Sequence, residues 1–279
     1  MTPTGEAGGD LSWATTFLFV PGARPDRFAR AAASGADVVV LDLEDGVAPS
    51  ERTFARQEVA AWLAAGNDAV VRISATGTED QVADLAALGG TSPAVMLAKA
   101  ESAADVEAVT ATLGPGTEVV ALVESARGLL GAGAIAAAPG VRRMALGNVD
   151  LASALGVDPN DRTTLLAARS MLVLASSAAG LTGPVDGVTT MIDDVELIRS
   201  DADHAASLGF RGKLCIHPRQ VAAAAQGFAP TAAQVAWAER VVETGAQGGA
   251  RAVDGAMVDR PVEVRARDIL CRAQRRPVN

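Results

Sequence analysis

Asp37-Val38-Val39-Val40-Leu41-Asp42-Leu43 and Asp68-Ala69-Val70-Val71-Arg72-Ile73 are the two apolar runs that decide the fold, and a helical stretch from residue 50 to about residue 65 separates them. Each run is continuous and does not alternate with polar residues, which is typical of parallel strands buried on both faces. The helical stretch is long enough to cross from one parallel strand to the next. The segment therefore predicts a strand–helix–strand unit.

The same alternation recurs about eight times along the chain. Further strands are expected over residues 16–20, 94–97, 118–124, 143–147, 184–188 and 213–217. Eight such units in a chain of this length predict an α/β fold, a TIM (β/α)8 barrel. An open doubly wound sheet is the alternative, but its dinucleotide signature is missing, because Gly131-Ala132-Gly133 lies inside a helical stretch.

The part of the chain beyond the eighth unit is extra to a barrel. We expect residues 1–230 to form the barrel and residues 231–279 to form a C-terminal helical extension that packs on a neighbouring subunit. Helices are expected after Pro218, after Thr231 and after Pro261.

The composition excludes several classes of protein. The 279 residues carry 24 basic and 33 acidic side chains, a net charge of −9, which argues against a nucleic-acid partner. No apolar run is long enough for a membrane span, and Met1–Asp10 lacks the basic and apolar regions of a signal peptide. Two distant cysteines and two histidines form no zinc or disulfide pattern. We expect a cytoplasmic protein whose metal, if any, has oxygen ligands.

Polar residues follow several of the predicted strands, at the barrel end where TIM-barrel enzymes carry their active sites. Glu124 ends strand five and Asp150 follows strand six, so neighbouring strand ends bring two carboxylates within reach of one cation. Mg²⁺ is typically held by one or two carboxylates, with water and substrate oxygens completing its shell. The alternative is that Glu124 caps the next helix and Asp150 lies in a solvated loop.

Arg72 ends strand three and should project over the same mouth, where a guanidinium can grip a carboxylate in a bidentate manner. The alternative is a salt bridge to Glu44 or Asp45, and both can hold if these acids orient the arginine. Glu44 and Asp45 are also candidates for bonding metal-bound waters. Gly46 after them is best explained by a simple turn.

Both histidines have a structural interpretation. His217 ends strand eight, where a lone histidine is more often a packing residue than a base, and His204 falls in a helical stretch and is expected on the surface. Cys215 is expected in the core.

Several motifs together resemble one known family. They are Phe17-Leu18-Phe19-Val20-Pro21-Gly22-Ala23-Arg24-Pro25-Asp26-Arg27, Leu41-Asp42-Leu43-Glu44-Asp45-Gly46-Val47-Ala48-Pro49, Val71-Arg72-Ile73, Ala121-Leu122-Val123-Glu124-Ser125-Ala126-Arg127-Gly128, Gly147-Asn148-Val149-Asp150-Leu151, Gly209-Phe210-Arg211-Gly212-Lys213-Leu214-Cys215-Ile216-His217-Pro218 and Gly255-Ala256-Met257-Val258-Asp259-Arg260-Pro261. In order, they resemble citrate lyase β-subunit-like proteins of the HpcH/HpaI aldolase superfamily, which includes malyl-CoA and citramalyl-CoA lyases.

The resemblance implies an Mg²⁺-dependent lyase that cleaves or forms the C–C bond of a 3-hydroxyacyl-CoA thioester such as malyl-, citramalyl- or citryl-CoA, releasing a keto acid and acetyl-CoA by a retro-Claisen reaction. One alternative is a citrate lyase β subunit that acts on an acyl-carrier-protein thioester within a complex. Another is a malate-synthase-like or thioesterase-like activity. A homo-oligomer, specifically a trimer, is implied as well.

The resemblance also assigns roles. Glu124 and Asp150 match the metal ligands, and Arg72 matches the arginine that grips the keto-acid carboxylate. Phe19, Arg24 and Arg30 fall where malyl-CoA lyases contact CoA. Asp259 matches a catalytic aspartate on the C-terminal extension that reaches a neighbouring subunit's site; from the residues alone it reads as a turn acid before Arg260-Pro261.

Three positions depart from the pattern of the family. Ala23 replaces an Asn or Ser, Ala98 replaces the Pro that commonly precedes Lys99, and Val149 replaces an acid. These departures bear on the preference for substrate more than on the chemistry.

Overall fold

The computed structural model describes residues 10–91, 94–245, 251–253 and 256–274, so the prediction for residues 1–9 lies outside the described part. The chain divides into two compact units, Met1–Gly227 and Phe228–Asn279. Each unit is described by itself below.

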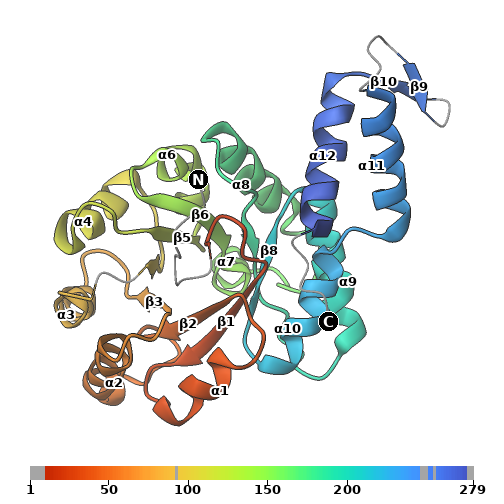
Figure 1. Ribbon diagram of the computed structural model, residues 1–279. Helices are drawn as coiled ribbons and strands as arrows, with labels where there is room; N and C mark the ends of the chain where they lie inside the picture. Colours follow the sequence, from red (N-terminus) through yellow and green to blue (C-terminus); the bar gives the residue numbers. More distant parts are fainter. Residues whose placement is uncertain (1–9, 92–93, 246–250, 254–255, 275–279) are drawn as a thin grey trace. The chain divides into compact units, whose positions relative to one another are not determined.

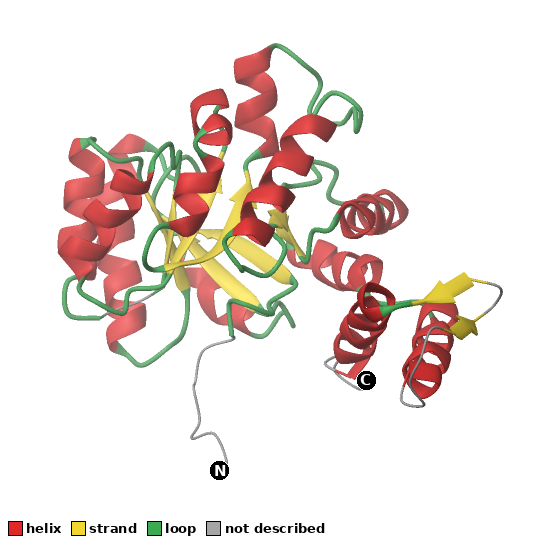
Figure 2. Cartoon of the chain, turned by 90° about the horizontal axis from the view of Figure 1, so that it is seen from above, coloured by secondary structure: helices red, strands yellow, loops and turns green. Residues whose placement is uncertain are grey.

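The first unit is a closed barrel of eight parallel strands with helices around it (Figures 1 and 2). Each strand pairs with the next, and β1 pairs with β8 to close the ring, Phe17 lying opposite Leu214. The strands are β1 Thr16–Pro21, β2 Val38–Asp42, β3 Val70–Ile73, β4 Val95–Leu97, β5 Val119–Val123, β6 Val141–Leu146, β7 Val185–Asp186 and β8 Gly212–Cys215. The predicted TIM barrel is confirmed, and the open sheet is excluded.

The helices of the barrel unit lie outside the strands (Figure 2). They are η1 Pro25–Arg27, α1 Phe28–Ala32, η2 Pro49–Glu51, α2 Arg52–Ala64, α3 Glu79–Leu88, α4 Ala103–Leu113, α5 Ala126–Leu130, α6 Ala132–Ala137, α7 Asn148–Leu155, α8 Leu166–Ala178, α9 Val195–Leu208 and α10 Pro218–Phe228. The start of α4 is fixed by a capping box in which the Ser102 hydroxyl accepts the amide of Asp105.

Two helical features differ from the sequence prediction. The helical stretch expected around Gly131-Ala132-Gly133 is divided at Gly131. The missing side chain of Gly131 lets the chain approach the carbonyl of Glu101, because a Cβ there would lie 2.8 Å from that oxygen. Helix α7 was not expected, because it begins with Asn148, Val149 and Asp150, which are weak helix formers.

The barrel interior follows the two-residue period of its strands. Apolar side chains fill it, among them Val40 on β2, Val70 on β3 and Leu122 on β5. Two residues further along each of these strands, the same inward direction is taken by Asp42, Arg72 and Glu124. The apolar core therefore gives way to charged side chains at the carboxyl end of the barrel.

The opposite end of the barrel is closed by the segment that precedes β1. Arg143 of β6 is fully buried, and its Nη1 donates to the carbonyl oxygens of Leu11, Ser12 and Ala14 at 2.9, 2.9 and 3.3 Å. Burial lowers the pKa of Arg143 to about 10, and the charge of Arg211 adds to this effect. The floor thus joins two segments that lie far apart in the sequence.

The described residues of the second unit form two helices and one antiparallel pair of short strands. Its elements are α11 Ala232–Gly245, β9 Arg251–Val253, β10 Ala256–Val258 and α12 Arg260–Gln274. Helix α12 packs along α11 (Figure 1), and the core between them includes Val241 and Ile269. The sequence prediction of a helical extension therefore holds for the two helices but missed the β9–β10 pair, whose strands of three residues each are too short to leave an apolar pattern.

No helix in the described part of the chain is both long and apolar enough to cross a membrane.

Candidate functional site

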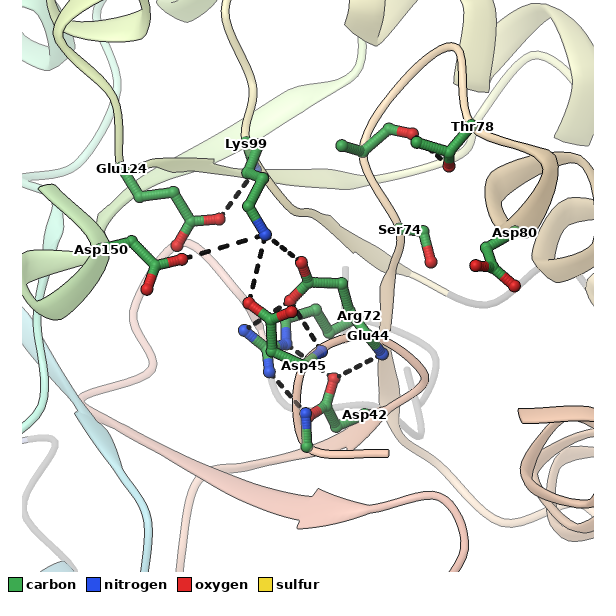
Figure 3. Close-up of polar contacts among 12 residues, drawn as sticks. Asp42, Glu44, Asp45, Arg72, Ser74, Thr78, Asp80, Lys99, Glu124 and Asp150 are labelled. Carbon is green, nitrogen blue, oxygen red and sulfur yellow. Dashed lines mark hydrogen bonds and ion pairs between the residues drawn. The ribbon is translucent and has the colours of Figure 1, made fainter. Parts of the chain in front are cut away.

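Acidic and basic side chains from five consecutive strand ends meet at the carboxyl end of the barrel (Figure 3). The acids are Asp42, Glu44, Asp45, Glu124 and Asp150, and the cations are Arg72 and Lys99. We call this set the mouth cluster. Glu44, Asp45, Arg72, Glu124 and Asp150 are the residues that the strand ends predict for one site, and they do lie together.

Arg72 is held mainly by an acid that the sequence analysis did not select. Its Nε and Nη2 donate to the two carboxylate oxygens of Asp42, both at 2.7 Å, and its Nη1 lies 3.2 Å from Glu44 Oε2. Burial alone would lower the pKa of the guanidinium, but the bonds to Asp42 and the charge of Glu44 outweigh burial and raise the pKa. The predicted salt bridge is thus confirmed for Glu44, and Asp42 adds a bidentate grip.

Asp42 also shapes the loop that follows β2. Its Oδ1 accepts the amide of Glu44, and its Oδ2 accepts the amide of Gly46, each at 2.9 Å. A Cβ at position 46 would collide with that same Oδ2, so glycine is required there. The amide of Val47 bonds the carbonyl of Glu44, which confirms the predicted turn.

Lys99 brings a positive charge into the middle of the acids. Its Nζ donates to Glu44 Oε1 and to Asp45 Oδ2, the latter at 3.1 Å, and lies 3.9 Å from Asp150 Oδ2 (Figure 3). Burial would lower the pKa of this ammonium, but the bonds to Glu44 and Asp45 raise it, so Lys99 is charged. The same contacts hold the pKa of Asp45 below its usual value, although partial burial opposes this effect.

Glu124 is the buried carboxylate of the cluster. Only 5% of the residue is exposed, and its Oε1 accepts the backbone amide of Lys99 at 2.9 Å. Burial, reinforced by the charge of Asp150, raises the pKa of Glu124 to about 7. The alternative that Glu124 caps the next helix is wrong, because the hydroxyl of Ser125 accepts the amide of Gly128 at the start of α5.

Asp150 and Glu124 are brought together from neighbouring strand ends. Asp150 lies in the first turn of α7, not in a solvated loop, and its side chain is 41% exposed. A Cβ at Gly147, directly after β6, would collide with the side chain of Glu124, so this position favours glycine. The result is one buried and one accessible carboxylate facing the same space (Figure 3).

This pair fits a hard divalent cation. Both ligands are oxygens, and among the described residues no group of three or more His, Cys, Asp or Glu is arranged to hold a metal. Mg²⁺ needs only one or two carboxylates, because it keeps several waters and takes further oxygens from a substrate. The pKa of Glu124 is raised first by burial and then by the charge of Asp150, and a bound cation would offset both effects.

The residues expected to contact CoA lie on and after β1. The guanidinium of Arg72 lies over the ring of Phe19, and the distance from Arg72 Cζ to the centroid of the ring is 4.8 Å. Phe19 therefore supports the arginine by a cation–π contact. Arg24 forms a bidentate pair with Asp26 at 2.9 and 2.8 Å, and Arg30 is exposed on α1. Their role toward CoA stays a prediction.

Asp259 lies in the C-terminal unit, between β10 and α12. It is exposed, and its Oδ1 accepts the amide of Val262 at 3.2 Å at the start of that helix. This hydrogen bond gives Asp259 a structural role at the start of α12, which agrees with the turn acid that the sequence alone suggests. The catalytic role of Asp259 stays a prediction.

The remaining candidates have structural roles. Nδ1 of His217 accepts the amide of Arg219 at 3.2 Å at the start of α10. Cys215 is 1% exposed, as expected for the core, and burial raises the pKa of its thiol to about 12. His204, expected on the surface, is half-buried, and its Nε2 is fully shielded.

Sequence reasoning missed Asp42 and Lys99 as members of the site. Asp42 lies directly opposite Arg72 in the strand register, so an opposite charge on the neighbouring strand was the available signal. Lys99 follows β4 and was seen only as the polar end of a strand; its left-handed backbone, with φ of 51°, is not visible in the sequence.

Comparisons with known proteins identify the family of the chain. The HpcH/HpaI aldolase/citrate lyase family matches residues 15–218. The citrate lyase subunit beta-like protein of Mycobacterium tuberculosis is 43% identical over 265 residues, which cover 92% of this chain and 94% of that protein. The (3S)-malyl-CoA thioesterase of Cereibacter sphaeroides is 35% identical over 268 residues, covering 92% and 93%. The crystal structure of protein CitE from M. tuberculosis in complex with magnesium, acetoacetate and coenzyme A superposes with a TM-score of 0.84 at 41% identity, covering 95% of this chain and all of that one.

Proposed function

Because the chain belongs to the HpcH/HpaI aldolase/citrate lyase family, we propose that it is an Mg²⁺-dependent carbon–carbon lyase that cleaves or forms the C–C bond of a 3-hydroxyacyl-CoA thioester. The products of cleavage are a keto acid and acetyl-CoA. The observation that carries the proposal is the mouth cluster, where a paired carboxylate site lies beside a fixed arginine. The related CitE crystal structure with magnesium, acetoacetate and coenzyme A supports this choice of ligands.

Glu124 and Asp150 hold the Mg²⁺ in this proposal. Bound there, Mg²⁺ supplies Lewis acidity to the oxygens of the reacting hydroxyl and carboxylate. Lys99 fixes Glu124 through its amide and fixes Glu44 and Asp45 through its ammonium. In the proposal, Glu44 and Asp45 bond waters around the metal.

Arg72 binds the carboxylate of the keto acid. A guanidinium has five N–H groups. Asp42 and Glu44 engage three of these N–H groups, which leaves two for a substrate. The Arg72 side chain is only 14% exposed. Since Asp42 and Phe19 hold the group from two sides, it orients the substrate at little further cost in entropy.

Asp259 is the acid that completes the reaction. Breaking the C–C bond converts the hydroxyl to the carbonyl of the keto acid, with release of the hydroxyl proton to solvent, and leaves a thioester enolate, whose carbon must then take a proton. Asp259 delivers that proton, and in the direction of condensation it removes it. We propose that Asp259 acts in the site of a neighbouring subunit, that the C-terminal extension packs on that subunit, and that the enzyme is a homotrimer.

Hydrolysis of the thioester is the second candidate. It is favoured by the 35% identity to (3S)-malyl-CoA thioesterase, which spans nearly the whole of both chains. The same mouth cluster would bind malyl-CoA, and water would then attack the thioester carbonyl. The products would be malate and CoA, with the C–C bond intact.

A third arrangement is a β subunit that takes its thioester from an acyl-carrier protein. Such an enzyme has less need of residues that contact CoA, so Arg24 and Arg30 separate the two cases. We place the enzyme in the cytoplasm, where its two free cysteines, Cys215 and Cys271, stay reduced.

The decisive experiment is a panel of thioesters assayed with Mg²⁺. Malyl-, citramalyl-, citryl- and 3-hydroxy-3-methylglutaryl-CoA are incubated with the enzyme, and keto acid, acetyl-CoA and free CoA are measured separately. Keto acid and acetyl-CoA in equal amounts are expected from one member of the panel. Free CoA without keto acid would contradict the lyase and support the thioesterase. Activity only on carrier-protein thioesters would support a β subunit that acts within a complex.

A further inference from the structure

Asn148 is a buried polar residue at the start of α7 that the proposed chemistry does not use. It is 4% exposed and lies two positions before Asp150. Its side-chain amide pairs with the backbone of Val188, in the segment after β7. Nδ2 of Asn148 donates to the carbonyl of Val188 at 3.1 Å, and the amide of Val188 donates to Oδ1 at 2.8 Å. Both ends of the side-chain amide therefore hold a single residue beyond the neighbouring strand.

This pair continues the contact between two strands beyond their pairing in the sheet. Strand β7 contains only Val185 and Asp186, and it pairs with β6 where Val185 lies opposite Ala145. A side-chain amide can take the place of a backbone pair because it offers a donor and an acceptor side by side. Asn148 thus joins the carboxyl ends of β6 and β7 at the rim of the barrel.

A glycine makes room for this contact. A Cβ at Gly187 would collide with the side chain of Asn148, just as a Cβ at Gly147 would collide with the side chain of Glu124. The first turn of α7 therefore packs closely on two sides, against the carboxylate that follows β5 and against the segment that follows β7.

The segment that Asn148 holds is itself fixed by other elements. Lys213 of β8 donates from Nζ to the carbonyl of Gly187 at 2.8 Å, and Gln220 of α10 donates from Nε2 to the carbonyl of Thr189 at 2.8 Å. Both of these side chains are buried. The residues before and after Val188 are thus held in place, which makes this segment a firm support for α7.

Asn148 and Asp150 lie on opposite sides of the first turn of α7. Successive residues of an α-helix are about 100° apart, so two positions correspond to roughly 200°. Asn148 is buried, whereas the Asp150 side chain is 41% exposed and faces Lys99 and Glu124 (Figure 3). The residue before the helix, Gly147, has no side chain with which to cap it. The pair between Asn148 and the segment after β7 supports this turn instead.

We propose that Asn148 is a positioning residue for metal binding, whose amide fixes the first turn of α7 and so holds the carboxylate of Asp150 toward Glu124. The inference rests on the proposed function, in which these two carboxylates hold Mg²⁺. Two ligands on different elements bind one cation well only if supporting contacts fix their geometry. Loss of such a supporting contact typically lowers the affinity for metal by about 10–100-fold.

The test compares two buried amides that hold the same segment. Asn148→Ala removes the support of α7, and the matched control Gln220→Ala removes a support of the segment after β7 that does not involve α7. Calorimetric titration of the full chain with Mg²⁺ should show about 10–100-fold weaker binding for Asn148→Ala and wild-type affinity for Gln220→Ala, although Tm falls in both. Wild-type affinity in Asn148→Ala would overturn the inference. An equal loss of affinity in both variants would overturn it too, because the cause would then be general stability.

Asp150→Ala separates a failure of this inference from a failure of the proposed function. If Asp150→Ala weakens binding of Mg²⁺ and Asn148→Ala does not, Asp150 is a ligand and only the role of Asn148 is wrong. If Asp150→Ala leaves the binding unchanged, the metal site of the proposed function is wrong, and the inference falls with it.

Hydrogen exchange of the wild type covers the case in which Asn148→Ala does not fold. Mg²⁺ should slow the exchange of the Val188 amide, because Asn148 joins that amide to the helix that carries Asp150. The control is the amide of Ile216, which donates to Oε1 of Gln220 at 2.8 Å and should be slowed less. Equal slowing of the two amides, or none at Val188, would contradict the inference.

Discussion

The backbone amide of Lys99 donates to Oε1 of Glu124 at 2.9 Å, and Lys99 takes a left-handed conformation, with φ of 51°, to make this bond. It is the only residue other than glycine with positive φ in the described ranges. Such a conformation typically costs about 1–3 kcal/mol and is kept where surrounding structure imposes it. Here, it aims an N–H at the buried carboxylate.

The two parts of Lys99 can therefore be separated by mutation. Lys99→Gly keeps the amide and tolerates positive φ but loses the ammonium, whereas Lys99→Val loses the ammonium and resists positive φ because valine is β-branched. We expect Lys99→Gly to bind Mg²⁺ at least as tightly as the wild type, since a competing cation near Asp150 is gone. Lys99→Val should bind it about 10–100-fold more weakly.

Calorimetric titration with Mg²⁺ measures both variants. Equal affinities for Lys99→Gly and Lys99→Val would show that the backbone geometry is unimportant for the ligand.

The raised pKa of Glu124 predicts that binding of Mg²⁺ depends on pH. The carboxyl is protonated below a pKa of about 7 in the metal-free protein, and a ligand must lose that proton. Affinity should therefore rise by about tenfold between pH 6 and pH 8 and level off above. Calorimetry in buffers of different ionisation enthalpy should register proton release at pH 6. Glu124→Ala should abolish the dependence of activity on Mg²⁺, and an unchanged affinity in this variant would refute the assignment.

The grip of Asp42 on Arg72 predicts a large effect on stability. Asp42 is 3% exposed, and removing one partner of a buried ion pair typically costs about 3–5 kcal/mol. Asp42→Asn should lower the free energy of unfolding by that amount in urea and raise KM for the keto acid in condensation. The matched control is Asp45→Asn, since the Asp45 side chain is 56% exposed and its ion pair contributes at most about 1 kcal/mol. Similar losses in the two variants would contradict this ranking.

The role of Asp259 predicts a loss of turnover without a loss of binding. Asp259→Asn should reduce kcat by about 10²–10⁴-fold, while the affinities for Mg²⁺ and keto acid stay unchanged. A mixture of Asp259→Asn and Glu124→Ala chains, unfolded and refolded together, should regain activity if the aspartate serves a neighbouring subunit. Near-normal turnover of Asp259→Asn would remove the residue from the mechanism, and an inactive mixture would place it in its own site.

The fold could be predicted because its signal is repeated. Eight apolar runs separated by helical stretches leave few alternatives, and the closing pair of β1 with β8 follows from their number. The polar strand ends then placed Glu124, Asp150 and Arg72 at one mouth, since the carboxyl ends of all strands share one rim. Only the order of elements was needed for this inference.

Details that depend on side-chain direction could not be predicted. Continuous apolar strands give no sign of which residues point inward, so the pattern of β2 alone did not distinguish Asp42, which enters the barrel, from an acid on its outside. The backbone of Lys99 and the N-terminal turn of α7 around Asp150 depend on neighbours distant in sequence. Resemblance to a family alone supplied Asp259, because its local pattern is that of a helix start.

The barrel floor has a consequence for the order in which the chain can fold during synthesis. Residues 11–14 leave the ribosome early, but the guanidinium that binds carbonyls of this segment belongs to Arg143. Strand β8, which pairs with the second edge of β1, ends only at Cys215. Until then, the first strand has an unpaired edge, which is prone to pairing with other chains. More than two thirds of the protein must therefore be made before its beginning is sheltered, so the nascent chain has a long interval in which chaperones can act.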